Sequence, residues 1–273
     1  LYNQSDTYIR YQGFEFLNPK PAELFNDAEF TPKLAAVSVT LSSEDILKNS
    51  GSNQLKDVME EHISAAEQEL QDRFVEDLHS DGTADDGKQI GGLQLMIPTD
   101  PTTGTYGGIS RADNAIWRTS SYDIHTELTD LVGSTDTQLN ADNVYDAFQV
   151  IVEAISRGKK GPDLILCSAQ HYRAFANATT AIQRITSTGE SALGELGFPS
   201  LKFHGVGKSI DVVLEGGIGS AMPDNVTYFL DTSSIKFRYH PDRNFVRFGG
   251  KQMPINQDAV VQHIGFYGEL TMN

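Results

Sequence analysis

Cys167 and His171 lie four positions apart and are the residue types best suited to nucleophilic chemistry. A cysteine thiolate beside a histidine is the reactive pair of many hydrolases. Cys167 ends an apolar run that starts at Leu164, however, and such a run predicts a buried strand in which a thiol is inert. We therefore expect Cys167 to be a core residue. A hydrolase that uses Cys167 or a carboxylate pair is the alternative.

The sequence also lacks the residue spacing of a phosphate-binding loop and of a metal site. Residues 205–209 read Gly-Val-Gly-Lys-Ser and resemble the end of a phosphate-binding loop, but Lys202 stands where that motif requires its first glycine. The 7 histidines are scattered singly and the chain has 1 cysteine, so no metal-ligand spacing is present. We expect a chain that holds no cofactor and no metal and is not an enzyme.

Acidic residues dominate the charge, because 37 Asp and Glu against 21 Lys and Arg give a formal net charge of -16. Such a surface repels phosphate backbones, which argues against a protein that reads DNA grooves. It suits a highly soluble protein, or a wall that encloses nucleic acid without adhering to it. No run approaches the roughly 18 apolar residues of a membrane span, so no membrane contact is expected.

The composition is otherwise that of a globular protein, with a hydrophobic share of 39% before its 24 glycines are counted. A single cysteine cannot form an internal disulfide, which favours a reducing compartment during assembly. The sequence begins at Leu1 rather than at a methionine, so we expect an upstream segment in the natural protein.

Residues 1–30 mix aromatic and polar side chains with two prolines and lack the period of a helix or strand, which predicts an extended N-terminal arm. Its aromatic residues are Tyr2, Tyr8, Tyr11, Phe14, Phe16, Phe25 and Phe30. Because so many aromatic side chains are poorly solvated on a free tail, we expect the arm to pack against its own body or against a neighbouring subunit.

A strand and a long helix follow the arm. Residues 34–41 alternate branched and small polar side chains, which is typical of a strand. Residues 55–79 contain neither glycine nor proline, and their apolar positions step by three or four along one narrow stripe between acidic faces. Such a helix is about 37 Å long. Because only one of its sides is packed, we expect it to run along a thin body. A coiled-coil seam is the alternative, although the stripe lasts only about three heptads.

The rest of the chain mixes helices and strands without a regular βαβ repeat, which indicates an α+β fold. A loop rich in glycine and aspartate is predicted at 80–93, and a turn-rich stretch anchored by Trp117 at 98–122. Helices are predicted at 144–157 and 169–177, and a loop at 194–206. The predicted strands are 164–167, 210–214, 226–230, 235–239 and 260–270.

Residues 240–246 read His-Pro-Asp-Arg-Asn-Phe-Val, a polar sequence between two predicted strands. Pro241 directly after a strand fits a plain turn. We favour a loop that protrudes and contacts a neighbouring molecule.

The order of these elements resembles that of HK97-fold major capsid proteins of tailed, double-stranded DNA bacteriophages. The matching features are the arm, the strand before Gly51, the long acidic helix to His79, the Ser-Asp-Gly-Thr loop that runs on to Gly-Gly-Leu93, the capped helix that leads into Pro162-Asp-Leu-Ile-Leu-Cys, and the turn at 240–246 before a closing strand. The resemblance covers nearly the whole chain, although the stretch 93–123 is longer than in the simplest members. It implies an HK97-like capsid fold without a catalytic site.

The resemblance also implies a flat subunit with two lobes. Its expected parts are an N-terminal arm at 1–26, an extended loop at 27–54 that reaches over an adjacent subunit, a peripheral domain at 55–130 with a spine helix at 55–79, an axial domain at 131–234, and a return to the peripheral domain at 235–273 that includes a loop at 240–258.

The function that the resemblance implies is self-assembly, in the bacterial host cytoplasm, into pentamers and hexamers of an icosahedral virion head. The head is expected to enclose double-stranded DNA without reading its sequence, and scaffolding, portal and decoration proteins are the expected partners. Candidate contacts between subunits are Phe25, Phe30, Lys33, Lys48, His240, Asp242, Arg243 and Asn244. Lys33, Lys48 and Asn244 also have the residue types with which some family members cross-link neighbouring subunits.

Three alternatives stay open at this point. An encapsulin-like compartment shares the fold but encloses enzymes, so bound nucleic acid distinguishes the two. A soluble hydrolase requires a closed pocket with perturbed pKa values. A monomeric binding protein of this length has a radius of gyration of about 18 to 19 Å, and a flat subunit with an arm has a larger one.

Overall fold

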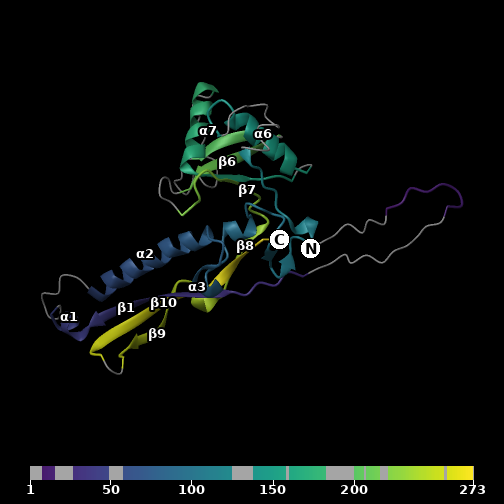
Figure 1. Ribbon diagram of the computed structural model, residues 1–273. Helices are drawn as coiled ribbons and strands as arrows, with labels where there is room; N and C mark the ends of the chain where they lie inside the picture. Colours follow the sequence, from purple (N-terminus) through teal and green to yellow (C-terminus); the bar gives the residue numbers. More distant parts are fainter. Residues whose placement is uncertain are drawn as a thin grey trace.

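The computed structural model describes residues 8–15, 27–48, 58–124, 138–157, 160–182, 200–205, 207–215, 221–254 and 257–272. Its helices and strands form two lobes (Figure 1). The long lobe is an elongated sheet covered by a long helix, and the short lobe is a second sheet packed against two helices. This mixture of helices and mainly antiparallel strands confirms the predicted α+β class.

The sheet of the long lobe has four strands, with β10 at its centre. β10 pairs antiparallel with β1 along the whole of β1, from Lys33 opposite Gly268 to Ser42 opposite Ala259. On its other side, β10 pairs antiparallel with β8 and with β9. The strands are β1 (Lys33–Ser42), β8 (Ile235–Tyr239), β9 (Val246–Gln252) and β10 (Ala259–Met272).

Helix α2 (Val58–Leu78) covers one face of this sheet (Figure 1). Its apolar stripe includes Ile63 and Leu70, which are both buried. Because side chains alternate between the faces of a strand, Val39 of β1 and Ile264 of β10 pack against this stripe. Each fully buried aliphatic side chain of this size stabilises the lobe by about 1.5–3 kcal/mol.

Phe74 extends the same interface toward the end of α2. Its ring lies 5.2–5.4 Å from the rings of Phe237, Phe245 and Phe266, each in an edge-on arrangement that aromatic quadrupoles favour. The opposite face of the sheet is different, because along β1 it is exposed to solvent. The exposed side chains there are Leu34, Ala36, Ser38 and Thr40.

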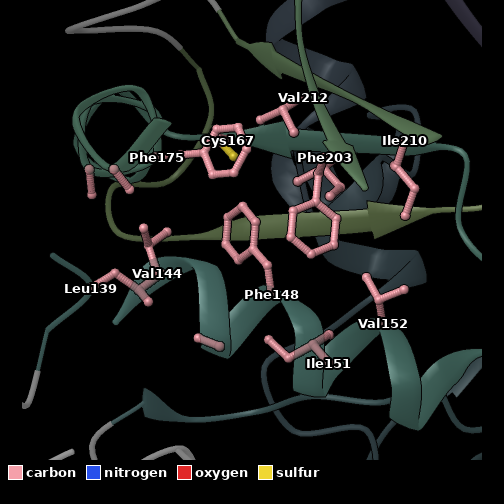
Figure 2. Close-up of a cluster of buried hydrophobic side chains, with 14 residues drawn as sticks. Leu139, Val144, Phe148, Ile151, Val152, Cys167, Phe175, Phe203, Ile210 and Val212 are labelled. Carbon is pink, nitrogen blue, oxygen red and sulfur yellow. The ribbon is translucent and has the colours of Figure 1, made fainter. Parts of the chain in front are cut away.

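In the short lobe, β4 pairs parallel with β6 and antiparallel with β7, and β5 pairs antiparallel with β6. The elements are β4 (Leu164–Cys167), β5 (Ser200–Gly205), β6 (Lys208–Leu214), β7 (Thr227–Leu230), α6 (Val144–Ile155) and α7 (Ala169–Ile182). Helices and sheet close over Phe148, Phe175 and Phe203, which are 0% exposed and in ring contact with one another (Figure 2). This lobe therefore has a complete core of its own.

Residues 93–118, named the joint here, pack against both lobes. They comprise α4 (Leu93–Met96), the short hairpin of β2 (Thr105–Tyr106) and β3 (Ile109–Ser110), and η1 (Ala115–Trp117). Trp117 is buried, and its Nε1 donates a hydrogen bond to the carbonyl oxygen of Tyr106 at 2.9 Å, which agrees with its predicted role as an anchor.

The loop between α2 and the joint turns sharply back on the end of the helix. It contains the single turn α3 (Ala84–Gly87), and the Ser80 hydroxyl closes the loop by donating to the carbonyl oxygen of Ile90 at 2.9 Å. A Cβ at Gly92 would lie 2.4 Å from the carbonyl oxygens of both Asp77 and Leu78. Glycine is thus required there by the close approach of two backbones.

Three differences from the predicted elements have identifiable causes. β5 lies inside the predicted loop 194–206, where the alternation of Leu201 and Phe203 is too short to stand out from its surroundings. β9 lies inside the predicted loop 240–258. The pair Gly249 and Gly250 suggests a turn, but both residues belong to a strand whose pairing with β10 has a register shift. α7 runs to Ile182 instead of ending at 177, since no glycine or proline stops it.

Part of the predicted extended loop 27–54 belongs to the sheet of the long lobe. Residues 33–42 form β1 and are paired with β10 of their own chain, and their reach over an adjacent subunit stays a prediction. Their alternation correctly predicts a strand, whereas its partner lies at the other end of the sequence and leaves no local signal. Residues 49–54, and residues 55–57 of the predicted long helix, lie outside the described residues.

Candidate assembly surfaces

The described part of the arm, residues 8–15, lies far from both lobes (Figure 1). Tyr8, Tyr11 and Phe14 are 82%, 62% and 106% exposed, so the body of their own chain does not cover them. Exposed apolar surface of this kind marks a site of interaction with another molecule. Of the two predicted partners for the arm, its own body is excluded for these residues.

Two aromatic residues of the arm were candidates for contacts between subunits. Phe30 packs on its own chain, with its ring 5.1 Å from that of Tyr106 in the joint. It fixes the point where the arm leaves the body, close to Gly107 of the same hairpin. Phe25 lies outside the described residues. A contact of either residue with a neighbouring subunit stays a prediction.

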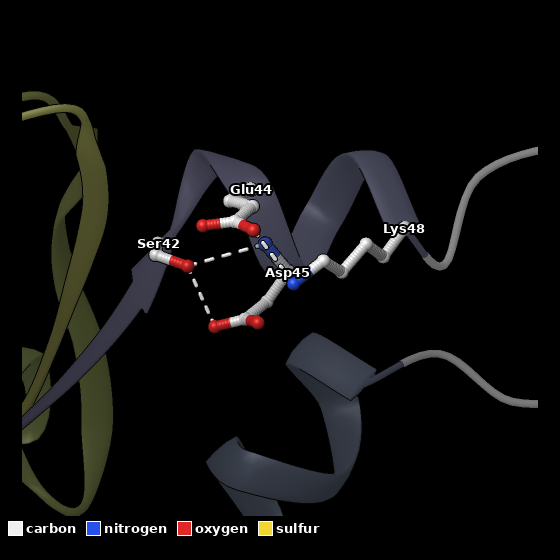
Figure 3. Close-up of polar contacts among 4 residues, drawn as sticks. All are labelled: Ser42, Glu44, Asp45 and Lys48. Carbon is white, nitrogen blue, oxygen red and sulfur yellow. Dashed lines mark hydrogen bonds and ion pairs between the residues drawn. The ribbon is translucent and has the colours of Figure 1, made fainter.

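The two candidate lysines lie at opposite ends of β1. Lys33 donates a hydrogen bond from Nζ to the carbonyl oxygen of Gly87 at 2.6 Å and so ties β1 to the loop after α2. Lys48 lies at the end of the exposed helix α1 (Ser43–Lys48) and forms an ion pair with Glu44 at 2.6 Å (Figure 3). Such an exposed pair contributes only about 0.2–1 kcal/mol, so Lys48 is easily drawn into another contact.

The predicted turn at 240–246 is a single 3-10 turn, η3 (Pro241–Arg243). His240 caps it by accepting a hydrogen bond at Nδ1 from the backbone N–H of Asp242 at 3.2 Å. The guanidinium of Arg243 lies 3.7 Å from the centre of the Phe248 ring, a cation–π contact that holds the turn against β9. Asn244 follows as the residue after the turn. These four candidates are neighbours on one turn, and their contact with a neighbouring subunit stays a prediction.

The open face of the long lobe continues from this turn and is cationic. Phe248 stacks on His263 with 5.6 Å between ring centroids, and Ser38 of β1 is bonded to Nδ1 of His263 at 2.8 Å. Residues 235–252 contain five Lys and Arg and one Asp, a local charge of +4 in a chain of -16, but Arg247 forms an ion pair with Glu67 of α2 at 3.1 Å and so lies on the side that the helix covers. The stacked rings and the exposed cations together form a surface suited to an acidic, aromatic partner.

Helix α2 gives the other side of the long lobe the opposite charge, because it carries seven acidic residues and one basic residue. Glu69, Asp72 and Glu76 are three and four positions apart, so they share the face that points away from the buried stripe. The long lobe therefore has an acidic side and a basic side.

The cysteine and histidine that suited nucleophilic chemistry are unreactive in this fold. Cys167 is 0% exposed, and burial raises the pKa of its thiol to about 12. Burial also lowers the pKa of His171 to about 4, and its Nδ1 is bonded to Oγ1 of Thr227 at 2.8 Å. A thiolate paired with an imidazolium is strongly disfavoured here, which supports the interpretation of Cys167 as a core residue.

The described residues contain neither a metal-binding cluster nor a membrane-spanning helix. No group of three or more His, Cys, Asp or Glu side chains in this part of the chain is placed to hold a metal ion. None of its helices is both long enough and apolar enough to cross a membrane.

Four residues that sequence reasoning missed are polar or charged groups at or near the place where the lobes meet. His79, Arg111 and Glu269 are 4%, 3% and 7% exposed, and Glu215 is bonded to His79. Isolated polar residues carry no periodic signal, and their burial depends on contacts between distant segments. Only the prediction that Trp117 anchors its stretch pointed to this region.

Comparison with solved structures gives the fold. The chain is similar to the capsid protein in the capsid asymmetric unit of cyanophage A-1(L), with a TM-score of 0.62, 17% sequence identity, and coverage of 87% of this chain and 72% of that chain. It has the HK97-like fold of phage capsid proteins. The holo-SrpI encapsulin complex from Synechococcus elongatus matches with a TM-score of 0.45, 12% identity, and coverage of 89% and 70% of the two chains. The procapsid of satellite phage P4 matches with a TM-score of 0.45, 8% identity, and coverage of 95% and 78%.

A family model identifies the group to which the chain belongs. The model of the SU10 major capsid protein matches residues 33–273. The chain therefore belongs to the SU10 major capsid protein family. No curated protein matches the chain.

Proposed function

We propose that this chain is the major capsid protein of a tailed phage and that its copies form the pentamers and hexamers of an icosahedral head around double-stranded DNA. The match to a major capsid protein family over residues 33–273 carries this proposal. A charge of -16 supports a wall to which the phosphate backbone does not adhere. The function involves no catalytic step.

The arm of one subunit covers the open face of the next in this proposal. The exposed side chains of residues 8–15 need an apolar partner. The stacked rings of Phe248 and His263 lie on the face that is exposed to solvent along β1. Charge supports the same pairing, because residues 1–30 carry five acidic and two basic residues. Residues 235–252 carry one acidic and five basic residues, and one of the basic residues, Arg247, is paired with α2. The part of the chain that reaches over a neighbour is then the segment before β1 instead of 27–54.

The remaining domain assignments follow from this arrangement. The long lobe corresponds to the peripheral domain, with α2 as its spine helix, and the short lobe corresponds to the axial domain around the five-fold and six-fold axes. The turn at 240–244 contacts a neighbouring long lobe. Assembly occurs in the host cytoplasm, and scaffolding, portal and decoration proteins are the partners that the shell meets.

Electron microscopy of the purified chain at rising concentration tests this function. We expect closed shells from the natural chain and unassembled subunits from a variant with Tyr8→Ser, Tyr11→Ser and Phe14→Ser, because residues 8–15 then have no aromatic side chain to bury against a neighbour. Val75→Ser, which truncates an exposed apolar residue on α2, is the matched control and should still assemble.

Three outcomes count against parts of the proposal. Persistent monomers of the natural chain, with a radius of gyration of about 18 to 19 Å, contradict a shell protein. Shells from the arm variant contradict the arm contact alone. Particles that enclose proteins instead of DNA indicate a compartment of the encapsulin kind.

A further inference from the structure

The two lobes share one hydrophobic cluster, and the joint provides its middle. Leu270 of β10 comes from the long lobe, and Leu230 of β7 comes from the short lobe. Between them lie Met96, Ile109 and Trp117 of the joint, each less than a tenth exposed. Rotation of one lobe against the other must therefore disturb a packed core instead of a flexible linker.

Directional bonds hold the joint in this position. Tyr106 accepts a hydrogen bond at its hydroxyl from the backbone N–H of Met272, the last described residue of β10, at 2.9 Å. Arg111 is buried beside it and donates to the carbonyl oxygens of Leu95 and Met96 at 2.6 and 3.1 Å. These bonds lock the hairpin onto α4 and onto the end of the long lobe.

One polar bridge links the lobes outside the joint. Nε2 of His79, just after α2, lies 3.2 Å from Oε1 of Glu215, just after β6. The backbone N–H of Glu215 donates to the carbonyl oxygen of Cys167 at 3.2 Å, so this glutamate is fixed to the sheet of the short lobe. His79 is 4% exposed and the side chain of Glu215 is 30% exposed, so water reaches the bridge only from the glutamate side.

We propose that the joint and the bridge between His79 and Glu215 hold the two lobes at one angle, and that this angle sets the curvature and the diameter of the shell. The inference rests on the proposed function, since only an assembled shell has a diameter. It gives a role to the stretch 93–123, whose length exceeds that expected of a minimal subunit. Tyr106 and Glu215 are positioning residues in this scheme.

The size of the effect follows from geometry. In a closed assembly the same contacts repeat around the surface, so a change of angle within one subunit recurs in every copy and alters whether and where the surface closes. Packed interfaces have discrete arrangements and are not continuously deformable. A loosened joint should therefore produce shells of several sizes instead of a slight, uniform swelling.

The first test measures particle diameters by electron microscopy. Glu215→Ala removes the bridge by truncating a side chain at the edge of the lobe, and Tyr106→Phe removes one hydroxyl from the joint. We expect each variant to form closed particles. The fraction of particles whose diameter differs from that of the natural shells should be several-fold larger than for the natural chain, and largest for the double variant. Glu215→Gln retains an acceptor for His79 and should restore the single class.

The second test measures the angle within unassembled subunits. Spin labels on Gln68→Cys in α2 and Arg173→Cys in α7 report the distance between the lobes, and Cys167 stays unlabelled because it is fully buried. We expect one narrow distance distribution for the natural joint and a broader or shifted one for Glu215→Ala. Glu215→Gln should again match the natural joint.

The outcomes separate this inference from the proposed function. Natural diameters and natural label distances in both Glu215→Ala and Tyr106→Phe overturn the inference and leave the shell function intact. If the label distances change but the shells keep one diameter, the joint sets the angle between lobes but not the curvature, and the inference is again wrong. Absence of any shell from the natural chain refutes the proposed function, and the inference fails with it.

Discussion

The two lobes bury their apolar surface in different ways. In the short lobe, helices and sheet enclose Phe148, Phe175 and Phe203, which are 0% exposed. In the long lobe, α2 covers one face of the sheet, while Leu34 on the other face is 66% exposed and Phe14 of the arm is fully exposed. The short lobe thus completes its core within one chain, whereas the long lobe and the arm leave apolar side chains exposed.

This difference indicates how stability and assembly are divided within the subunit. Contacts in the short lobe exist before assembly, so they contribute to the free energy of unfolding of the isolated chain. In the proposed shell, contacts of the arm and the open face form between copies, so their contribution depends on subunit concentration. Substitutions in the two regions should therefore affect different measurements.

The largest effect on the isolated subunit is expected from Phe148→Ala. Its ring contacts those of Phe175, Phe203 and Phe229, and removing it leaves a cavity that the closed core cannot fill. We expect the free energy of unfolding to fall by about 3–5 kcal/mol, measured by urea denaturation of unassembled chains. A loss below about 1 kcal/mol would mean that the short lobe is not the self-contained part of the molecule.

The same truncation in the arm gives the sharpest contrast. Phe14→Ala should change the free energy of unfolding by less than about 0.5 kcal/mol, since an exposed ring has no contacts to lose. It should nevertheless raise the concentration at which shells appear, measured by light scattering. If Phe14→Ala destabilises the isolated chain as Phe148→Ala does, the arm packs on its own body and the comparison between the lobes is wrong.

The sequence predicts the local elements of both lobes well. The strand at 164–167 is found at its predicted bounds, because a short apolar run after Pro162 has one obvious interpretation. The long helix follows from a stripe that no glycine or proline interrupts, and in the structure it ends at Leu78. Patterns that repeat within about ten residues carry this information.

What the sequence does not predict depends on contacts between distant segments. The pairing of β1 with β10 joins distant parts of the chain, so the sequence predicts a strand at 34–41 but not the strand with which it pairs. Phe30 lies in a segment whose composition predicts an arm, but its ring packs on that of Tyr106 in the joint. His79 and Glu215 are unremarkable on their own elements, and only the approach of the two lobes brings them together.

A smaller effect is expected from Glu269→Gln, which tests how the end of β10 tolerates a buried charge. Oε1 of Glu269 accepts a hydrogen bond from the backbone N–H of Gly91 at 2.9 Å, and burial raises the pKa of this carboxyl. Glutamine keeps the acceptor for Gly91 and removes the charge. The variant should be at least as stable as the natural chain at neutral pH.

The stability difference between the natural chain and Glu269→Gln should depend on pH. A raised pKa means that the folded chain binds the proton of Glu269 more tightly than the unfolded chain. The natural chain therefore loses stability as the pH rises from the unfolded pKa through the raised folded pKa, and Glu269→Gln lacks that loss. The difference between the two denaturation curves from pH 4 to 7 measures it, with the exposed Glu60→Gln as control. A difference that grows toward low pH contradicts the burial of this charge.

The smallest effect is expected at the tip of the long lobe, where α1 begins. The Ser42 hydroxyl accepts a hydrogen bond from the backbone N–H of Asp45 at 3.1 Å and donates one to its carboxylate at 2.6 Å (Figure 3). Ser42→Ala removes this cap, which is worth about 0.5–2 kcal/mol to a helix, and Ser42→Thr retains it.

Every residue of α1 lies outside the core, so the loss of its cap should remain local. Hydrogen exchange of the amides at 43–48 should accelerate in Ser42→Ala but not in Ser42→Thr, while the global unfolding of both variants stays that of the natural chain. A global loss of stability in Ser42→Ala would show that the tip is coupled to the core. The long lobe would then be less dependent on its neighbours than its exposed surface indicates.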